Sequence, residues 1–293
     1  GGQQEAVKIS EYVQIIKANK PLQRLMIAGG GCKLALAIAQ NMTVLIMLYG
    51  CMMGNYDTFN MVFMALGYVF SAPFFLLTVR TSQKHGQKAS LMKYVSIALL
   101  CYIGVFVLLA LWQPGNPAFN LSLVGEGGLS INLYTILFIL CFGVGYGAYY
   151  STADMPIPMV ADCADYETYR SGKFIPGIMG TLFSLVDKLV SPLAAAVVSV
   201  ALMCIGIHDL PTKVTPYAEG MNWVVIALFC IIPMIAWALT LVSMKGYALD
   251  GERVKVIQAV NAARKAAIAD GMSTDEAMAT ITDESVMAEK VAD

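Results

Sequence analysis

Charged residues are scarce in this chain. Only 13% of its 293 residues are Asp, Glu, Lys or Arg, whereas 58% are hydrophobic and the mean hydropathy is +0.66. A soluble domain usually has about a quarter of its residues charged. A water-soluble fold of this composition would leave a large apolar surface in contact with water. The composition therefore excludes an ordinary soluble domain and indicates a membrane protein.

Basic stripes, metal-ligand spacings and catalytic triads are missing as well. The net charge is −1 and no segment has the basic character that binds nucleic acid, so that class of partner is excluded. The seven cysteines show no CxxC pair and no Cys/His spacing, so we expect free thiols, no metal site and no tightly bound cofactor. His85 and His208 fall in connections expected on opposite sides of a membrane. No nucleophile triad can form from them, and we predict that the chain is not an enzyme.

Long apolar runs are what the chain has in abundance. A bilayer core about 30 Å thick is crossed by about 20 mostly apolar residues in a helix. Six segments meet that length: 25–49, 61–79, 91–112, 131–161, 175–205 and 223–244. We predict an all-α membrane protein with a cytoplasmic segment over 1–24, a bundle of six transmembrane helices over 25–244 and a short cytoplasmic helical tail over 245–293.

Basic residues are concentrated in alternate connections. Lysines and arginines precede the first span, fill the second and fourth connections and follow the sixth span, whereas the other three connections contain only Lys213. Because Lys and Arg are retained on the cytoplasmic side of short loops, both termini are predicted to be cytoplasmic. The expected location is the cytoplasmic (inner) membrane.

The tail is polar. Of the 39 charged residues, 15 lie from Lys245 onward. Ser273 and Glu276 form a capping-box pattern, which predicts the start of a short helix. Before it, segment 251–269 carries apolar residues at helical spacing among basic ones. Such a segment either lies on the membrane face or forms a solvated helical tail.

The fifth span carries polar side chains at helical spacing. Thr181, Ser184, Lys188 and Ser191 are three or four residues apart and therefore share one helix face. An ionisable group near the bilayer centre costs about 2.5–3.5 kcal/mol, so Lys188 needs a partner or a water-filled cavity. We interpret this face as a substrate-binding or coupling site; the alternative is a structural ion pair, either between helices or between Lys188 and the adjacent Asp187. Asp187 points about 100° away from Lys188 and is expected to lie outside that site.

Two further spans carry candidate substrate-binding residues. In the first span, Lys33 follows three glycines at 29–31, which allow close approach of another helix, and interrupted helices border the substrate in many transporters. Lys33 is either a binding residue or a structural lysine that extends to the membrane interface. In the fourth span, tyrosines offer a ring to stack on a sugar, and the glycines among them allow close helix packing. The tyrosines are Tyr146, Tyr149 and Tyr150, and the glycines are Gly143, Gly145 and Gly147.

One segment of the chain carries the pattern of a known family. Its elements in order are Ala161-Asp162, Asp165-Tyr166-Glu167, Gly172-Lys173, Gly177-Ile178 and a mid-helix Lys188. In these residues the chain resembles the glycoside-pentoside-hexuronide:cation symporters, the melibiose permease-like group of the major facilitator superfamily. The segments 80–88 and 247–250 are also similar to this family, and the resemblance covers about residues 10–257. Phe174 stands where the family usually has Arg, and Ser171 where it has Thr.

The resemblance implies a function and a partner. It identifies the six spans as helices seven to twelve, the C-terminal half, of a twelve-helix carrier that moves a sugar, glycoside or oligosaccharide together with Na⁺ or H⁺. The main cation site would then lie in the N-terminal six-helix half, an expected partner in the same parent chain or in a separate one, besides the lipid bilayer itself. Lys188 is expected near the sugar. An inner gate is expected to form from ion pairs of Asp162, Asp165, Glu167, Arg170 and Lys173.

Two other functions stay open on the sequence. A lysolipid or other amphiphile carrier of the same fold would need an apolar cavity open to lipid, whereas the polar face of the fifth span favours a sugar. A non-transporting membrane scaffold would predict that Lys188→Ala alters folding and no flux.

Overall fold

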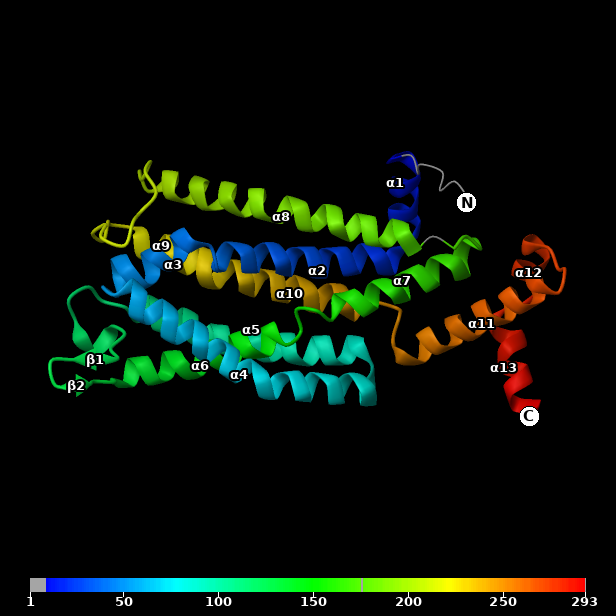
Figure 1. The fold of residues 1–293 in the computed structure, drawn as a ribbon, viewed down its shortest axis with the longest axis horizontal. Coiled ribbons are helices and arrows are strands. Elements are labelled where there is room, and N and C mark those ends of the chain that lie inside the picture. Colours follow the sequence, from blue (N-terminus) through cyan, green and yellow to red (C-terminus); the bar gives the residue numbers. More distant parts are fainter. Residues whose placement is uncertain (1–8, 175, 293) are drawn as a thin grey trace.

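The computed structural model describes residues 9–174 and 176–292, and these are almost entirely helical (Figure 1). Within them, six helical stretches are long and apolar enough to cross a membrane. They are Lys20–Ala39, Tyr56–His85, Gln87–Leu111, Leu133–Tyr150, Met179–Cys204 and Met221–Lys245. The predicted all-α architecture with six spans is confirmed. Residues 1–8 of the predicted N-terminal segment, the predicted start of the fifth span at Ile175 and residue 293 of the tail lie outside the described residues.

The first span is divided near its middle. Helix α1 (Ile9–Ala18) leads into α2 (Lys20–Ala39), and a new helix, α3 (Met42–Leu45), begins after Asn41. The Asn41 side chain accepts a hydrogen bond from the Thr43 backbone N–H at 2.9 Å, which stabilises a helix start. The chain then continues as the wider π-type helix η1 (Ile46–Met52). The segment 25–49, predicted as one span, therefore contains a break.

The fourth span ends earlier than predicted. Helices α4 (Tyr56–His85) and α5 (Gln87–Leu111) are followed by a loop that contains η2 (Pro117–Phe119) and a hairpin of β1 (Val124–Gly125) and β2 (Gly128–Leu129). Helix α6 (Leu133–Tyr150) then stops, and α7 (Pro156–Ser171) begins after a turn. Proline lacks the N–H that continues a helix but suits its first turn, so Pro156 starts a separate helix inside the predicted segment 131–161.

The bundle is packed most tightly around α6, which lies against α4 and α5. A Cβ atom on Gly147 would lie 2.8 Å from the backbone carbonyl carbon of Phe70, so only glycine allows α4 to come this close. Helix α8 (Pro176–Cys204) lies alongside α2 and is far less covered: 17% of its apolar stretch is buried, against 56% for α6. The last span comprises α9 (Met221–Val225), η3 (Ile226–Ile231) and α10 (Ile232–Lys245).

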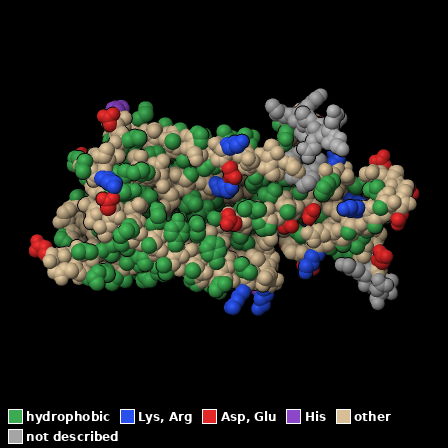
Figure 2. Space-filling view, in the orientation of Figure 1, with side chains coloured by type: hydrophobic (Ala, Val, Ile, Leu, Met, Phe, Trp, Pro, Cys, Tyr) green, Lys and Arg blue, Asp and Glu red, His purple; other side chains and the backbone are tan. Residues whose placement is uncertain are grey.

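The tail forms three helices beyond the end of the bundle (Figure 1): α11 (Gly251–Ala269), α12 (Thr274–Thr280) and α13 (Asp283–Ala292). The Ser273 hydroxyl accepts from the Glu276 backbone N–H at 3.2 Å, so the capping pattern starts α12 as predicted. Ile257 and Val260 of α11 are buried against the protein, so this apolar face is not available to a membrane surface. Figure 2 shows hydrophobic side chains over most of the visible face of the bundle, with few charges among them.

Candidate functional site

A cavity of about 540 Å³ lies among α2, α4, α6 and α8. Each of these helices contributes one polar side chain to its wall: Lys33 from α2, Tyr68 from α4, Tyr146 from α6 and Asp187 from α8. Gln40, just after α2, adds an amide whose nitrogen is buried and has no hydrogen-bond partner among the described residues. The remaining wall is apolar and consists of Leu36, Ala37, Met64 and Val190. We call this space the polar cavity.

An ion pair joins the two sides of the polar cavity. Lys33 Nζ lies 2.5 Å from Asp187 Oδ1, and the two side chains are 41% and 52% exposed. Lys33 is thus a predicted binding residue that lines the polar cavity. Asp187 was expected to lie outside the Lys188 site or, in the alternative, to pair with Lys188, and its pairing with Lys33 was missed.

Lys188 faces a different space. With Thr181 and Ser184 it lines a hollow of about 380 Å³ on the exposed side of α8. The Thr181 hydroxyl donates to the Gly177 carbonyl at 2.9 Å, and Lys188 has no ion-pair partner in the described part of the chain. The predicted polar face of the helix is present, but it does not converge with Lys33 and Tyr146. The structure therefore divides the predicted substrate-binding set between two sites.

The three tyrosines of α6 also separate. Tyr146 lines the polar cavity, and Tyr150 stacks on it with ring centroids 5.8 Å apart. Tyr150 also meets the edge of Tyr68 at 5.3 Å, so it supports the aromatic wall from behind. Tyr149 points elsewhere, because successive helix residues turn by about 100°. It is buried against Trp237 at 5.2 Å, and the expectation that all three tyrosines face one site is corrected.

A comparison with protein-family models identifies the chain. The model described as MFS/sugar transport protein matches residues 1–251, which is most of the chain. The chain belongs to this family of sugar transporters. No curated protein matches it closely. The family and the six apolar helices together make it a multi-pass membrane transporter of the major facilitator superfamily.

The expected inner-gate residues of this transporter lie on α7 or directly after it. Glu167 is almost fully buried and pairs with Arg170, one turn further on, at 2.6 Å. The buried Asn19 amide, at the start of α2, donates to the same carboxylate at 3.3 Å and to the Cys163 carbonyl at 3.2 Å. Glu167 therefore connects the α7 segment to the beginning of the first span. Lys173 is exposed just past the end of α7.

Two carboxylates of the expected gate, Asp162 and Asp165, lie close to one another on α7. Burial raises the pKa of Asp162 to about 6, and the charge of Asp165 adds to the increase. Asp165 is held by the tail: its backbone carbonyl accepts from the Asn261 amide at 2.9 Å, and its carboxylate from Gln258 at 3.3 Å. Of the predicted gate residues, Glu167 and Arg170 form an ion pair with each other within the described chain.

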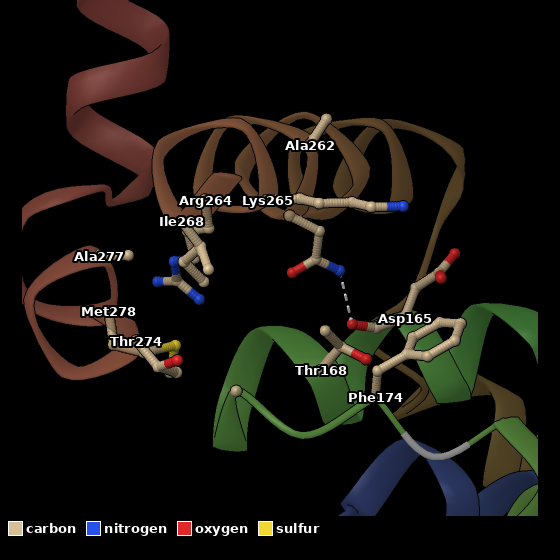
Figure 3. Close-up of a pocket in the computed structure, with 12 residues that line it drawn as sticks. Asp165, Thr168, Phe174, Ala262, Arg264, Lys265, Ile268, Thr274, Ala277 and Met278 are labelled. Atoms are coloured by element: carbon tan, nitrogen blue, oxygen red, sulfur yellow. Dashed lines mark hydrogen bonds between the residues drawn. The ribbon is translucent and has the colours of Figure 1, made fainter. Parts of the chain in front are cut away.

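A second cavity, of about 370 Å³, separates the gate segment from the tail (Figure 3). Its wall combines Asp165, Thr168 and Phe174 with Arg264 and Lys265 of α11 and with residues of α12. Beside it, Tyr169 lies between two guanidinium groups, Arg253 at 5.3 Å and Arg264 at 5.1 Å from its ring centre. Its hydroxyl donates to Asp283 of α13 at 2.8 Å. The tail is thus fastened to the helix that carries the expected gate.

Three polar residues of the polar cavity were not among the sequence candidates: Gln40, Tyr68 and Asp187. Asp187 had a usable signal, since an acid in one span and a lysine in another must each find a countercharge in a membrane. Gln40 and Tyr68 had none, because a single amide or tyrosine in a span is common and only the fold brings them together.

Proposed function

We propose that this chain supplies helices seven to twelve of a cation-coupled sugar symporter of the cytoplasmic membrane. Both termini lie in the cytoplasm, and an N-terminal six-helix bundle completes the carrier. The sugar-transport family match and the six spans support the carrier fold, and the alternation of basic connections supports the orientation.

The polar cavity is the main structural support for a sugar as the substrate. Its volume of about 540 Å³ lies within the range of small-molecule sites, roughly 300–1,000 Å³. A sugar presents hydroxyl groups at its edge and C–H bonds on its faces. Lys33 and Asp187 offer a donor and an acceptor to the hydroxyls, and Tyr68, which is 47% exposed, offers a ring surface for the C–H face. The combination favours a sugar over a lysolipid, which needs a continuous apolar wall.

Transport follows from rocking the two six-helix halves about a site near the membrane midplane. In that motion the Asn19 bond to Glu167 holds α7 against α2 while the inner side is closed, and Arg170, one turn further along α7, pairs with the same carboxylate. Opening toward the cytoplasm requires the Asn19–Glu167 bond to separate. One half alone offers only one wall of the substrate site, so it is not expected to transport.

The test is cation-driven uptake of a panel of labelled sugars and glycosides by proteoliposomes. The chain is reconstituted alone and together with a matching N-terminal half, under an imposed Na⁺ gradient, a pH gradient or neither. We expect accumulation of at least one sugar only with both halves and only under a gradient. Equal sugar levels with and without gradients, for every sugar tested, would contradict the symporter.

A further inference from the structure

The Lys33–Asp187 pair occupies an unusual position. Four ion pairs occur among the described residues, and the other three involve loops, α7 or the tail: Glu167–Arg170, Asp57–Lys213 and Arg253–Asp283. Both Lys33 and Asp187 lie inside membrane-crossing helices, and both border the polar cavity. A charge in that position is stable only with a countercharge or with water around it.

The glycines of α2 bring the two partners together. A Cβ atom on Gly30 would lie 3.2 Å from a methyl group of Val186, and one on Gly29 would lie 3.8 Å from the Phe183 ring. Helix α8 therefore packs on the glycine face of α2, one turn before the ion pair. This close approach lets the Lys33 ammonium reach Asp187 across the cavity wall.

The pair also restricts what each partner can bind. While its ammonium is held by Asp187, Lys33 has fewer N–H groups for an incoming ligand. A monovalent cation on the Asp187 carboxylate would replace that positive charge and release the ammonium. The released lysine would then need new acceptors, and the hydroxyl oxygens of a sugar in the cavity supply them.

Resting on the proposed symport, we infer that Asp187 is a binding site for the coupling cation in this half of the carrier. In the structure the Lys33 ammonium occupies this site as the ion-pair partner of Asp187. The coupling cation, a proton or Na⁺, displaces that ammonium. The titratable groups that face Asp187 are Lys33 from α2, Tyr68 from α4 and Tyr146 from α6; Lys188 of the same helix borders the other hollow. Cation binding frees the Lys33 ammonium to donate hydrogen bonds to the sugar, and the bound sugar stabilises the cation on Asp187.

Thermodynamic reciprocity makes this coupling measurable. If the cation raises the affinity for sugar by a certain factor, the sugar raises the affinity for the cation by the same factor. Allosteric couplings are typically 5–150-fold, so a change of roughly tenfold in sugar Kd is expected. The cation that occupies Asp187 is the one whose effect on sugar Kd is lost when the Asp187 carboxylate is removed.

The experiment measures sugar Kd in the reconstituted full carrier, with Na⁺ varied at fixed pH in one arm and pH varied without Na⁺ in the other. In the wild type, one arm tightens sugar binding by roughly tenfold. Asp187→Asn is expected to bind sugar equally with and without the cation, to retain sugar exchange across the membrane, and to lose accumulation under a gradient. Asp57→Asn, which breaks the exposed pair with Lys213, is the matched control and should behave as the wild type.

The outcomes separate the inference from the function on which it rests. Suppose that the wild type accumulates sugar and that Asp187→Asn retains both accumulation and cation-dependent sugar binding. The cation site at Asp187 is then contradicted, and the symporter is not. A wild type without cation dependence contradicts the symporter, and the inference with it. If Asp187→Asn does not fold, Lys33→Gln decides: removal of the competing ammonium should tighten cation binding and weaken sugar binding. Unchanged cation affinity in that variant overturns the inference.

Discussion

Lys33 and Asp187 are 154 residues apart in the sequence and 2.5 Å apart in space. Their contact joins α2 to α8, a helix that is otherwise poorly covered by the bundle. The position of α8 therefore depends mainly on its packing along α2, and changes to that packing should affect transport more than changes elsewhere on the same helix.

Adjacent glycines of α2 provide a direct test of that dependence. Gly30→Leu places a side chain against Val186, whereas Gly31→Leu meets no described atom within 4 Å of the added Cβ. Overpacking costs about 1–3 kcal/mol, and displacement of the binding residues by about 1 Å lowers uptake by an order of magnitude or more. We expect Gly30→Leu to lower Tm and uptake in the full carrier. Similar values for the two variants would show that α8 does not depend on the glycine face.

Removal of the Glu167 carboxylate should destabilise the closed inner side. In Glu167→Ala, Arg170 loses its ion pair and the buried Asn19 amide loses one acceptor. A buried polar group left without its partner costs about 1–3 kcal/mol. Thermal unfolding in detergent measures the loss. Glu126→Ala, in the exposed hairpin, should change stability by less than about 0.5 kcal/mol.

Asp162 should make stability depend on pH near 6. Its folded pKa of about 6 lies above the ordinary value of 3.8, so the folded protein favours the protonated form. The resulting stability is present below the ordinary pKa and is lost as the pH rises through about 6. Because the group is partly solvated, the loss is below about 1 kcal/mol. Asp162→Asn should raise Tm at neutral pH and remove this step; an unchanged pH profile of Tm would contradict the assignment.

Docking of the tail through Asp283 should depend on pH in the opposite direction. Burial alone would raise its pKa, but hydrogen bonds from Arg253 and Tyr169 and the nearby positive charges outweigh that effect and lower it. The tail docking that this carboxylate stabilises is present above the ordinary Asp pKa and is lost as the pH falls through the lowered value. Hydrogen exchange of α13 amides at decreasing pH should report the release. Asp283→Asn should release α13 at neutral pH, whereas Glu284→Gln on the same helix should not.

Much of the fold could be predicted from local patterns. Apolar length identified the six spans, and the Ser273–Glu276 pattern located the start of α12. The break after Tyr150 was missed because the following residues stay apolar enough to continue a span, although Pro156 marks a new helix start. Helix periodicity correctly grouped Thr181, Ser184 and Lys188 on one face.

The composition of the polar cavity was less accessible to sequence reasoning. Periodicity gives the relative directions of side chains within one helix, but the rotation of α8 against α2 is set by packing of Val186 on Gly30. That rotation directs Asp187, and not Lys188, toward Lys33. The tail was likewise ambiguous, because an apolar helix face suits a membrane surface as well as the protein surface that α7 provides.

Sugar-induced cation movement is the most direct test of whether sugar and cation cross together and whether Asp187 binds that cation. Sugar is added to proteoliposomes that contain the complete carrier and no gradient, and the movement of H⁺ or Na⁺ is followed on the same timescale as sugar entry. We predict that one of these cations enters with the sugar and that Asp187→Asn admits sugar without it. Sugar entry into wild-type vesicles with no movement of either cation would contradict it.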